Sequence, residues 1–337
     1  MKLSFSKEHL TEIINTVQKA IAPKTVLPIL ECIKIDANGD GNVVITGNSI
    51  ETCIEYNTKI DVTEGGEVAL TSKMFGEIVR RMPEGTVSIN VDPENNITQI
   101  KGGASKFNIQ GMNSSEFPAA PVLDEQFRFT IDQEKLKKII RKTINFVAVN
   151  EGKKPVLTGA LFEINGNVLT VVASDGHRLA VVKEELEKEL PSSKTVIPGS
   201  TLREVFKLLK DEGTVDIIVA ERNVMFDFKD FQFYTRQLDG DFLKYEKIID
   251  VKNTIRAVCE KNYIMGSLER AQLLINDDIS AHSDNKVPVR LNVGFNKIEI
   301  SCITSKGQVN DVVPAEIEGG ELFIGFNCRF LLDAFSA

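Results

Sequence analysis

A threefold internal repeat is the feature that most constrains this fold. The clearest copy, Leu169–Val182, reads LTVVASDGHRLAVV, in which two apolar runs flank the polar centre SDGH. This pattern predicts two strands joined by a tight turn, with Gly176 at a position of positive φ. Related units run from Val43 to Tyr56 and from Ile298 to Val313. The chain is therefore expected to build one supersecondary unit three times.

Each copy predicts the same order of elements. A strand and an amphipathic helix come first, a strand and the hairpin follow, and a second helix closes the unit. The first helices are expected over residues 6–21, 132–148 and 261–275, with Asp132 as an N-cap. The second helices are expected over residues 72–82, 199–210 and 325–336. The expected fold is α+β, with three pseudo-repeated domains of two helices and antiparallel sheets each, at residues 1–124, 125–250 and 251–337.

The third copy is the shortest of the three. After its second helix, copy one continues from Arg81 to Pro118, and copy two continues from Lys210 to Phe242. Copy three ends at Ala337, at the end of its second helix. By this register, the third domain is expected to lack its C-terminal strands in a truncated chain.

Composition narrows the class of protein. The chain has 337 residues, of which 42% are hydrophobic and 26% are charged, as in a soluble globular protein. No apolar run reaches the roughly 20 residues that span a membrane, and the N-terminus leads into a polar helix, so we expect a cytoplasmic protein. The five cysteines are scattered and never spaced as CxxC. Neither a metal site, a disulfide framework nor a cofactor is expected.

The distribution of charge matters more than its total. The formal net charge of −8 alone argues against a nucleic-acid partner. The six expected helices together carry +8, however, which leaves −16 on the rest of the chain (−8 minus +8). Arg203 and Lys207 lie opposite the apolar face of their helix, as do Lys138 and Lys142. Repeated helix faces of this kind would suit a phosphate backbone, although a solvated helix face remains the alternative.

Residues 174–177 also invite a catalytic interpretation. Ser174, Asp175 and His177 are the residue types of a hydrolase triad, but neighbours within one turn rarely converge in space. No GxSxG elbow, Walker loop or HExxH helix accompanies them. We expect no catalytic residues. His177 and Arg178 are better interpreted as polar groups in an apolar peptide groove beside Leu157, with a structural histidine as the open alternative.

Six segments together resemble the bacterial DNA polymerase III beta subunit family, the β sliding clamps. They are LPILECIKI from residue 27, EFPAAP from 116, KPVLTGALFE from 154, ASDGHRLAVV from 173, VIPGSTL from 196 and GFNCRFLLDAF from 325. The resemblance implies three similar domains per chain and a head-to-tail homodimeric ring, with helices lining the hole. Double-stranded DNA would run through the hole, bound without regard to sequence. The replicative polymerase, the clamp loader and repair proteins would bind through short peptide motifs.

Site residues follow from the resemblance and from the basic helices. The implied partner-peptide groove comprises Leu157, Ser174, Gly176, His177, Arg178, Leu179, Leu243, Lys247, Ile248, Asn327 and Phe330. The helix faces offer Arg80, Lys138, Lys142, Arg203 and Lys207 as DNA-facing residues, to which the resemblance adds Lys24, Glu151, Pro155 and Val156. The implied dimer contact brings Lys73 and Phe107 against Leu273 and Leu274. The expected function is a non-catalytic processivity clamp; the alternatives are a peptide-binding scaffold without DNA encirclement and a hydrolase using Ser174 and His177.

Overall fold

The computed structural model describes the chain except for residues 23–24, 150–151, 153 and 280–286, and except for the side chains of residues 277–279. It divides into two compact units, Met1–Phe242 and Leu243–Ala337. The first unit contains copies one and two of the repeat, and the second contains copy three. Both units combine helices with antiparallel sheets, which confirms the expected α+β class.

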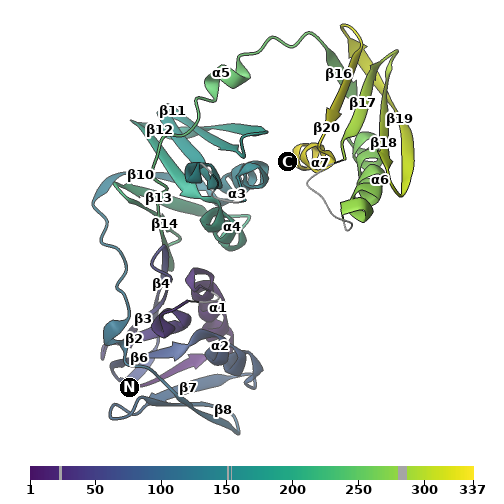
Figure 1. Cartoon of the computed structure of the whole chain (residues 1–337). Helices are drawn as coiled ribbons and strands as arrows, with labels where there is room; N and C mark the ends of the chain where they lie inside the picture. Colours follow the sequence, from purple (N-terminus) through teal and green to yellow (C-terminus); the bar gives the residue numbers. More distant parts are fainter. Residues whose placement is uncertain (23–24, 150–151, 153, 280–286) are drawn as a thin grey trace. The chain divides into compact units, whose positions relative to one another are not determined.

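Copy one places two helices beside strands from two sheets. Its elements are β1 (Lys2–Ser6), α1 (Lys7–Val17), β2 (Cys32–Ala37), β3 (Asn42–Asn48), β4 (Thr52–Lys59), β5 (Asp61–Glu64), β6 (Gly66–Thr71), α2 (Ser72–Arg81), β7 (Thr86–Val91), β8 (Ile97–Gly102) and β9 (Ser105–Gln110). The Ser6 side chain caps α1 by accepting a hydrogen bond from the His9 amide at 3.3 Å. Helices α1 and α2 lie side by side (Figure 1).

Copy two repeats this order. Its elements are β10 (Glu125–Asp132), α3 (Gln133–Thr143), β11 (Gly159–Ser174), β12 (Leu179–Pro198), α4 (Gly199–Leu208), β13 (Thr214–Ala220), β14 (Asn223–Asp227) and β15 (Phe231–Arg236). The helix expected to reach residue 148 ends at Thr143 and continues as a 3₁₀ turn over Ile144–Phe146. Asp132 occupies the N-cap position as expected, but its side chain accepts no hydrogen bond from the helix. Its carboxylate lies 3.9 Å from Lys135 Nζ instead.

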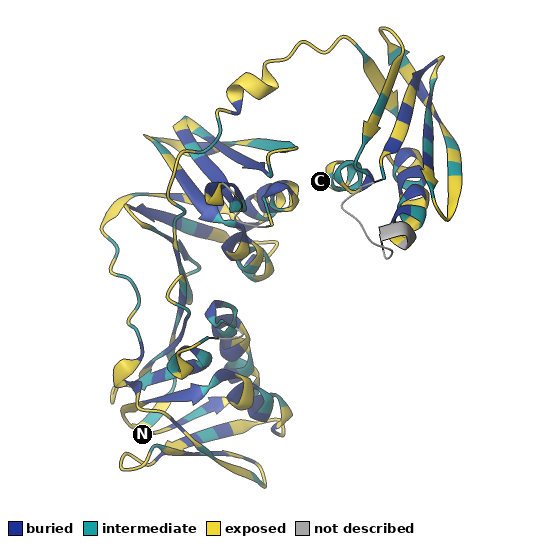
Figure 2. Cartoon of the chain, viewed as in Figure 1, coloured by how far each residue is buried: buried dark blue, intermediate teal, exposed yellow. Residues whose placement is uncertain are grey.

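A single sheet joins copies one and two. Its strand order is β10-β13-β14-β15-β4-β3-β2-β6, and the junction is the antiparallel pair of β15 with β4, where Phe233 lies opposite Ile54. One hydrophobic core accordingly contains residues from both copies, including the fully buried Phe75, Phe226 and Phe233. Figure 2 shows buried residues in dark blue along the strands and along the helices of both copies. Copies one and two therefore fold as one body.

Copy three forms the second unit around its own core. The elements of this unit are α5 (Glu246–Ile249), β16 (Arg256–Cys259), α6 (Lys261–Ile279), β17 (Val289–Gly294), β18 (Lys297–Thr304), β19 (Gly307–Glu318), β20 (Leu322–Phe326) and α7 (Cys328–Ser336). The strands form one sheet in the order β16-β19-β18-β17-β20. Ile264, Leu268, Ala271 and Ile275 of α6 are buried against it. None of the described helices combines the length and the apolar character needed to cross a bilayer.

Candidate functional site

The turn between β11 and β12 is held together by its own polar side chains. The Ser174 hydroxyl donates to the Arg178 carbonyl at 2.7 Å and accepts from the Gly176 amide at 3.1 Å. Asp175 Oδ1 accepts from the amides of His177 and Arg178 at 2.9 and 3.1 Å. Gly176 has φ +88°, as predicted. Because a hydroxyl has one proton to donate, Ser174 uses it on the turn, and this geometry gives the hydrolase hypothesis no support.

Arg178 is fixed on three sides. Its Nε donates to Asp175 Oδ2 at 2.9 Å, its Nη2 donates to the Asn145 carbonyl at 2.6 Å, and its guanidinium carbon lies 4.9 Å from the Phe146 ring centroid. The Arg178 side chain is only 16% exposed. Sequence reasoning missed Asn145 and Phe146, because it assigned both to the helix that ends at Thr143.

The predicted groove residues differ in exposure and lie in both units. In the first unit Leu157 and Ser174 are buried, Arg178 and Leu179 are partly buried, and Gly176 and His177 are exposed. In the second unit Lys247 and Ile248 are exposed on α5, and Leu243 and Phe330 are partly buried. Asn327 caps α7, with its side chain accepting from the Arg329 amide at 3.0 Å. The geometry within each unit does not test whether they form one groove, which stays a prediction.

Helix α3 carries both paired and uncompensated cations. Lys138 Nζ lies 2.6 Å from Glu134, and Lys135 Nζ lies 2.9 Å from Glu184, whose hydrogen bond raises the pKa of Lys135. Arg141 and Lys142 are exposed, and neither forms an ion pair with any described residue. They leave positive charge on the solvent side of the helix. Arg141 was missing from the sequence-based candidates, although its exposure follows from the same helical spacing.

Helix α4 shows the same mixture. Glu204 lies 2.7 Å from Lys207 Nζ of its own helix and 3.7 Å from Lys19 Nζ of copy one. Arg203 is exposed and has no ion pair in the part of the chain that the structure describes. Arg203, Glu204 and Lys207 line an open cleft of about 420 Å³ together with Ile144, Ser200 and Phe206. Glu204 reduces the positive charge of this face without cancelling it.

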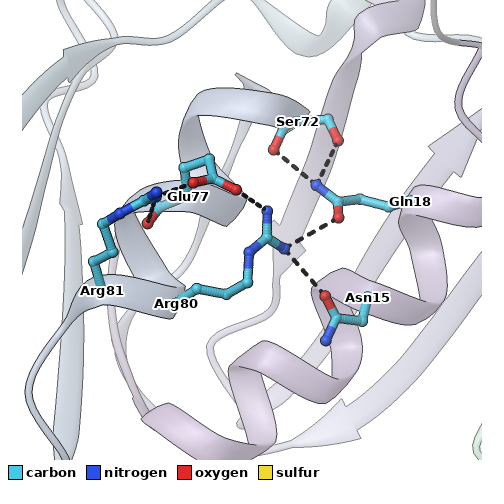
Figure 3. A network of polar contacts seen from close by, with 6 residues as sticks. All are labelled: Asn15, Gln18, Ser72, Glu77, Arg80 and Arg81. Carbon is cyan, nitrogen blue, oxygen red and sulfur yellow. Dashed lines mark hydrogen bonds and ion pairs between the residues drawn. The ribbon is translucent and has the colours of Figure 1, made fainter.

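Arg80 is part of a polar network between α1 and α2 (Figure 3). Its guanidinium donates to Asn15 Oδ1 at 3.1 Å, to Gln18 Oε1 at 3.4 Å and to Glu77 Oε1 at 2.8 Å. Gln18 also donates to the Ser72 carbonyl and hydroxyl, each at 3.0 Å. Arg80 therefore joins the two helices of copy one, with fewer donors left for a phosphate than the sequence suggests.

Of the remaining DNA-facing candidates, Pro155 and Val156 begin the 3₁₀ turn Pro155–Thr158. Lys24 and Glu151 are outside the described residues. Pro155 is exposed, whereas the side chain of Val156 is only 5% exposed and packs inward. Pro155 is thus the member of this pair that can meet a ligand with its side chain.

Among the proposed dimer residues, Phe107 lies on an edge strand, and Leu273 and Leu274 lie on the helix that packs against β19. Phe107, 43% exposed, belongs to β9, the last strand of the sheet β5-β1-β7-β8-β9, and Lys73 is exposed at the start of α2. In the second unit Leu273 is 69% exposed and Leu274 partly buried on α6. Strand β19 pairs with β16 only from Ala315 to Glu318, so the outer edge of its first half has no partner among the described strands. Such edges can pair between chains.

Comparison with known proteins places the chain in a family. The N-terminal, central and C-terminal domains of the DNA polymerase III beta subunit match residues 1–121, 130–244 and 246–337. The chain is 36% identical over 348 residues to the beta sliding clamp of Halalkalibacterium halodurans, and 33% identical over 346 residues to that of Bacillus subtilis. These alignments cover 99% of this chain and 90% and 89% of the relatives.

A solved structure agrees with the sequence comparisons. The DNA polymerase sliding clamp from Bacillus subtilis superimposes with a TM-score of 0.90 at 32% identity, covering 99% of this chain and 89% of that one. The threefold repeat, the fold and all three domain matches thus indicate the same family. The chain belongs to the DNA polymerase III beta subunit family, the β sliding clamps.

Proposed function

We propose that this protein is the sliding clamp of a bacterial replicative DNA polymerase. Two copies close head to tail into a ring around duplex DNA in the cytoplasm, and the ring tethers the polymerase so that synthesis is processive. The protein carries out no reaction of its own. The observation that carries this proposal is the set of exposed, uncompensated cations Arg141, Lys142 and Arg203 on the helices of an acidic chain.

These cations suit a duplex that must slide. Arginine and lysine that meet only phosphates position a protein on DNA without reading its sequence. On the same helices Glu134 pairs with Lys138 and Glu204 pairs with Lys207, which lowers the local positive charge and keeps direct affinity weak. Binding is salt-sensitive because salt cations compete with the protein for the phosphates. Retention then comes from the closed ring, while the negative charge elsewhere on the chain repels DNA.

In this proposal, partner proteins bind at the partner-peptide groove that the sequence predicts. Short apolar peptides from the polymerase, the clamp loader and repair proteins pack against Leu179 and Ile248 near His177. The fixed Arg178 supplies a positioned guanidinium at this place. The small interface that a short peptide forms supports affinities on the order of micromolar.

The domains of the clamp are assigned as residues 1–124, 125–250 and 251–337.

Loading onto circular DNA tests the proposal. Clamp placed on a nicked circle by a loader should stay bound through gel filtration and should dissociate when the circle is cut to a linear form. Reversal of charge at Arg203 and Lys142 to glutamate should reduce loading, whereas the same change at Lys183 and Lys188 of β12 should not. Equal retention on linear and circular DNA would contradict encirclement and would favour a scaffold that binds peptides alone.

A further inference from the structure

A second cleft lies where copies one and two meet, and the proposed clamp function does not use it. It has a volume of about 340 Å³ and sits at the seam where β15 pairs with β4, at Tyr234 opposite Cys53. Three segments form its walls: the β3–β4 turn, the linker after β9, and the ends of β14 and β15. The lining residues are Asn48, Ile50, Glu51, Cys53, Pro118, Ala119, Pro121, Arg222, Asn223, Tyr234, Thr235 and Arg236.

The turn at the rim of this cleft is strained and held in place. Ile50 has φ +75°, a conformation that β-branched residues rarely adopt, and its side chain is 64% exposed. Asn48 maintains it: its Oδ1 accepts from the Ile50 amide at 2.7 Å, and its Nδ2 donates to the Pro118 carbonyl at 3.2 Å. Asn48 itself is 3% exposed. The fixed turn thus presents the apolar side chain of Ile50 to solvent. Strained backbone conformations of this kind cluster at binding sites.

The charge of the cleft is positive in an acidic chain. Arg222 and Arg236 are exposed, and neither forms an ion pair with any residue that the structure describes. Their main chains are anchored, since the Arg236 amide donates to the Glu51 carbonyl at 3.0 Å and the Gln237 amide donates to the Arg222 carbonyl at 2.9 Å. Glu51 supplies the one carboxylate of the lining. Two guanidinium groups, one on the turn between β13 and β14 and one at the end of β15, are a suitable pair for carboxylates.

The cleft lies beside a turn that has a counterpart in copy two. The β3–β4 turn is the copy-one counterpart of the turn at residues 174–178, and in both copies a linker follows the last strand. The inference that both turns bind peptides rests on the proposed function of the turn at residues 174–178. The residues and charges of the cleft do not depend on it.

We propose that this junction cleft is a second docking site, for an extended peptide segment that carries an apolar side chain next to carboxylates. The apolar side chain would pack on Ile50, Pro118 and Pro121, and the carboxylates would bind Arg222 and Arg236. A small inorganic anion would use only the arginines and leave the apolar wall exposed. A peptide with both features matches the whole lining.

Fluorescence anisotropy with two labelled peptides tests the site. The first probe alternates aspartate with leucine, and the second replaces each aspartate with asparagine. Full-length protein should bind the first at least about tenfold more tightly, because the second cannot form charge-assisted hydrogen bonds to guanidinium. The double variant Arg222→Gln, Arg236→Gln should bind the first probe at least about tenfold more weakly than the wild type does.

Two controls separate this site from others. Lys183→Gln, Lys188→Gln removes the same charge from exposed positions on β12 and should leave binding unchanged. His177→Ala should also leave it unchanged, whereas it should weaken polymerase peptides if the groove is assigned correctly. The proposal would be overturned if the Arg222, Arg236 variant bound the first probe as tightly as the wild type does. It would also be overturned if the lysine variant lost as much affinity as the arginine variant, or if free phosphate displaced the first probe as well as unlabelled peptide does.

Discussion

Gly47 of β3 has no room for a side chain. A Cβ at this position would lie 2.3 Å from the Val17 carbonyl oxygen, at the end of α1. Because that oxygen belongs to the main chain, helix and strand would have to separate. Gly47→Ala should lower the free energy of unfolding by about 1–3 kcal/mol, as overpacking does. Urea unfolding measures it, and Gly39→Ala, where a Cβ meets nothing within 4 Å, is the control. Equal effects of both changes would contradict the packing argument.

Glu55 makes stability depend on pH. Burial raises the pKa of its carboxyl, although the Tyr234 hydroxyl, donating at 3.4 Å, and the Lys34 charge act in the opposite direction. Below the ordinary glutamate pKa, both folded and unfolded chains hold the proton. As the pH rises past that value, the unfolded chain ionises first, and the folded state loses stability until Glu55 itself ionises.

The substitution Glu55→Gln should therefore stabilise the protein at neutral pH and have a smaller effect in acid. Glutamine keeps an acceptor for the Tyr234 hydroxyl without the buried charge. Thermal melts of both proteins from pH 4 to pH 8 measure the difference. A stabilisation that is largest at pH 4 would show that the carboxylate is not the cause.

At the scale of single elements, Glu204 moderates the basic face of α4. It is shared between Lys207 and Lys19, so it both reduces the local charge and links the two copies. Ion pairs at the protein surface contribute about 0–1 kcal/mol, so Glu204→Gln should change the melting temperature little. It should increase loading on nicked circular DNA and make it persist to higher salt. Glu212→Gln removes an exposed carboxylate after α4 and should have no such effect. Equal gains in both variants would point to overall charge instead.

The sequence predicted the elements well because its periodicities are local. The hairpin at residues 174–177, the positive φ of Gly176 and the burial of Ile264, Leu268 and Ala271 on α6 all follow from short-range patterns. The end of α3 did not, since Ile144–Phe146 keeps the apolar pattern while the chain tightens into a 3₁₀ turn. For the same reason the sequence did not predict that the Phe146 ring packs on the Arg178 guanidinium.

The other features that the sequence did not predict depend on contacts between residues far apart in the chain. Nothing in the residues of β4 and β15 specifies that these strands pair across two copies of the repeat. The junction cleft and the Lys19–Glu204 contact depend on that pairing. Likewise, the spacing that places Arg80 on a polar helix face does not reveal that Asn15 and Gln18 of the neighbouring segment bind its guanidinium.

At the scale of the whole molecule, dimerisation through β9 and β19 is the prediction on which encirclement depends. Phe107 and Leu273 are exposed apolar side chains at the two proposed contact surfaces. An aspartate at either position would bury an unpaired charge in the interface, which proteins tolerate poorly. Sedimentation of the wild type should give twice the chain mass of 37.4 kDa, whereas Phe107→Asp and Leu273→Asp should each sediment as single chains.

The same variants then separate ring closure from DNA affinity. Because the basic faces of α3 and α4 are unchanged, Phe107→Asp should keep the weak, salt-sensitive binding to short duplexes but should not be retained on nicked circles. Val122→Asp places the same charge on a side chain that is 97% exposed in the linker, so it should remain dimeric and be retained. A Phe107→Asp protein that sediments as a single chain and still stays on circular DNA would rule out topological linkage, because an open chain cannot be held by the continuity of the DNA.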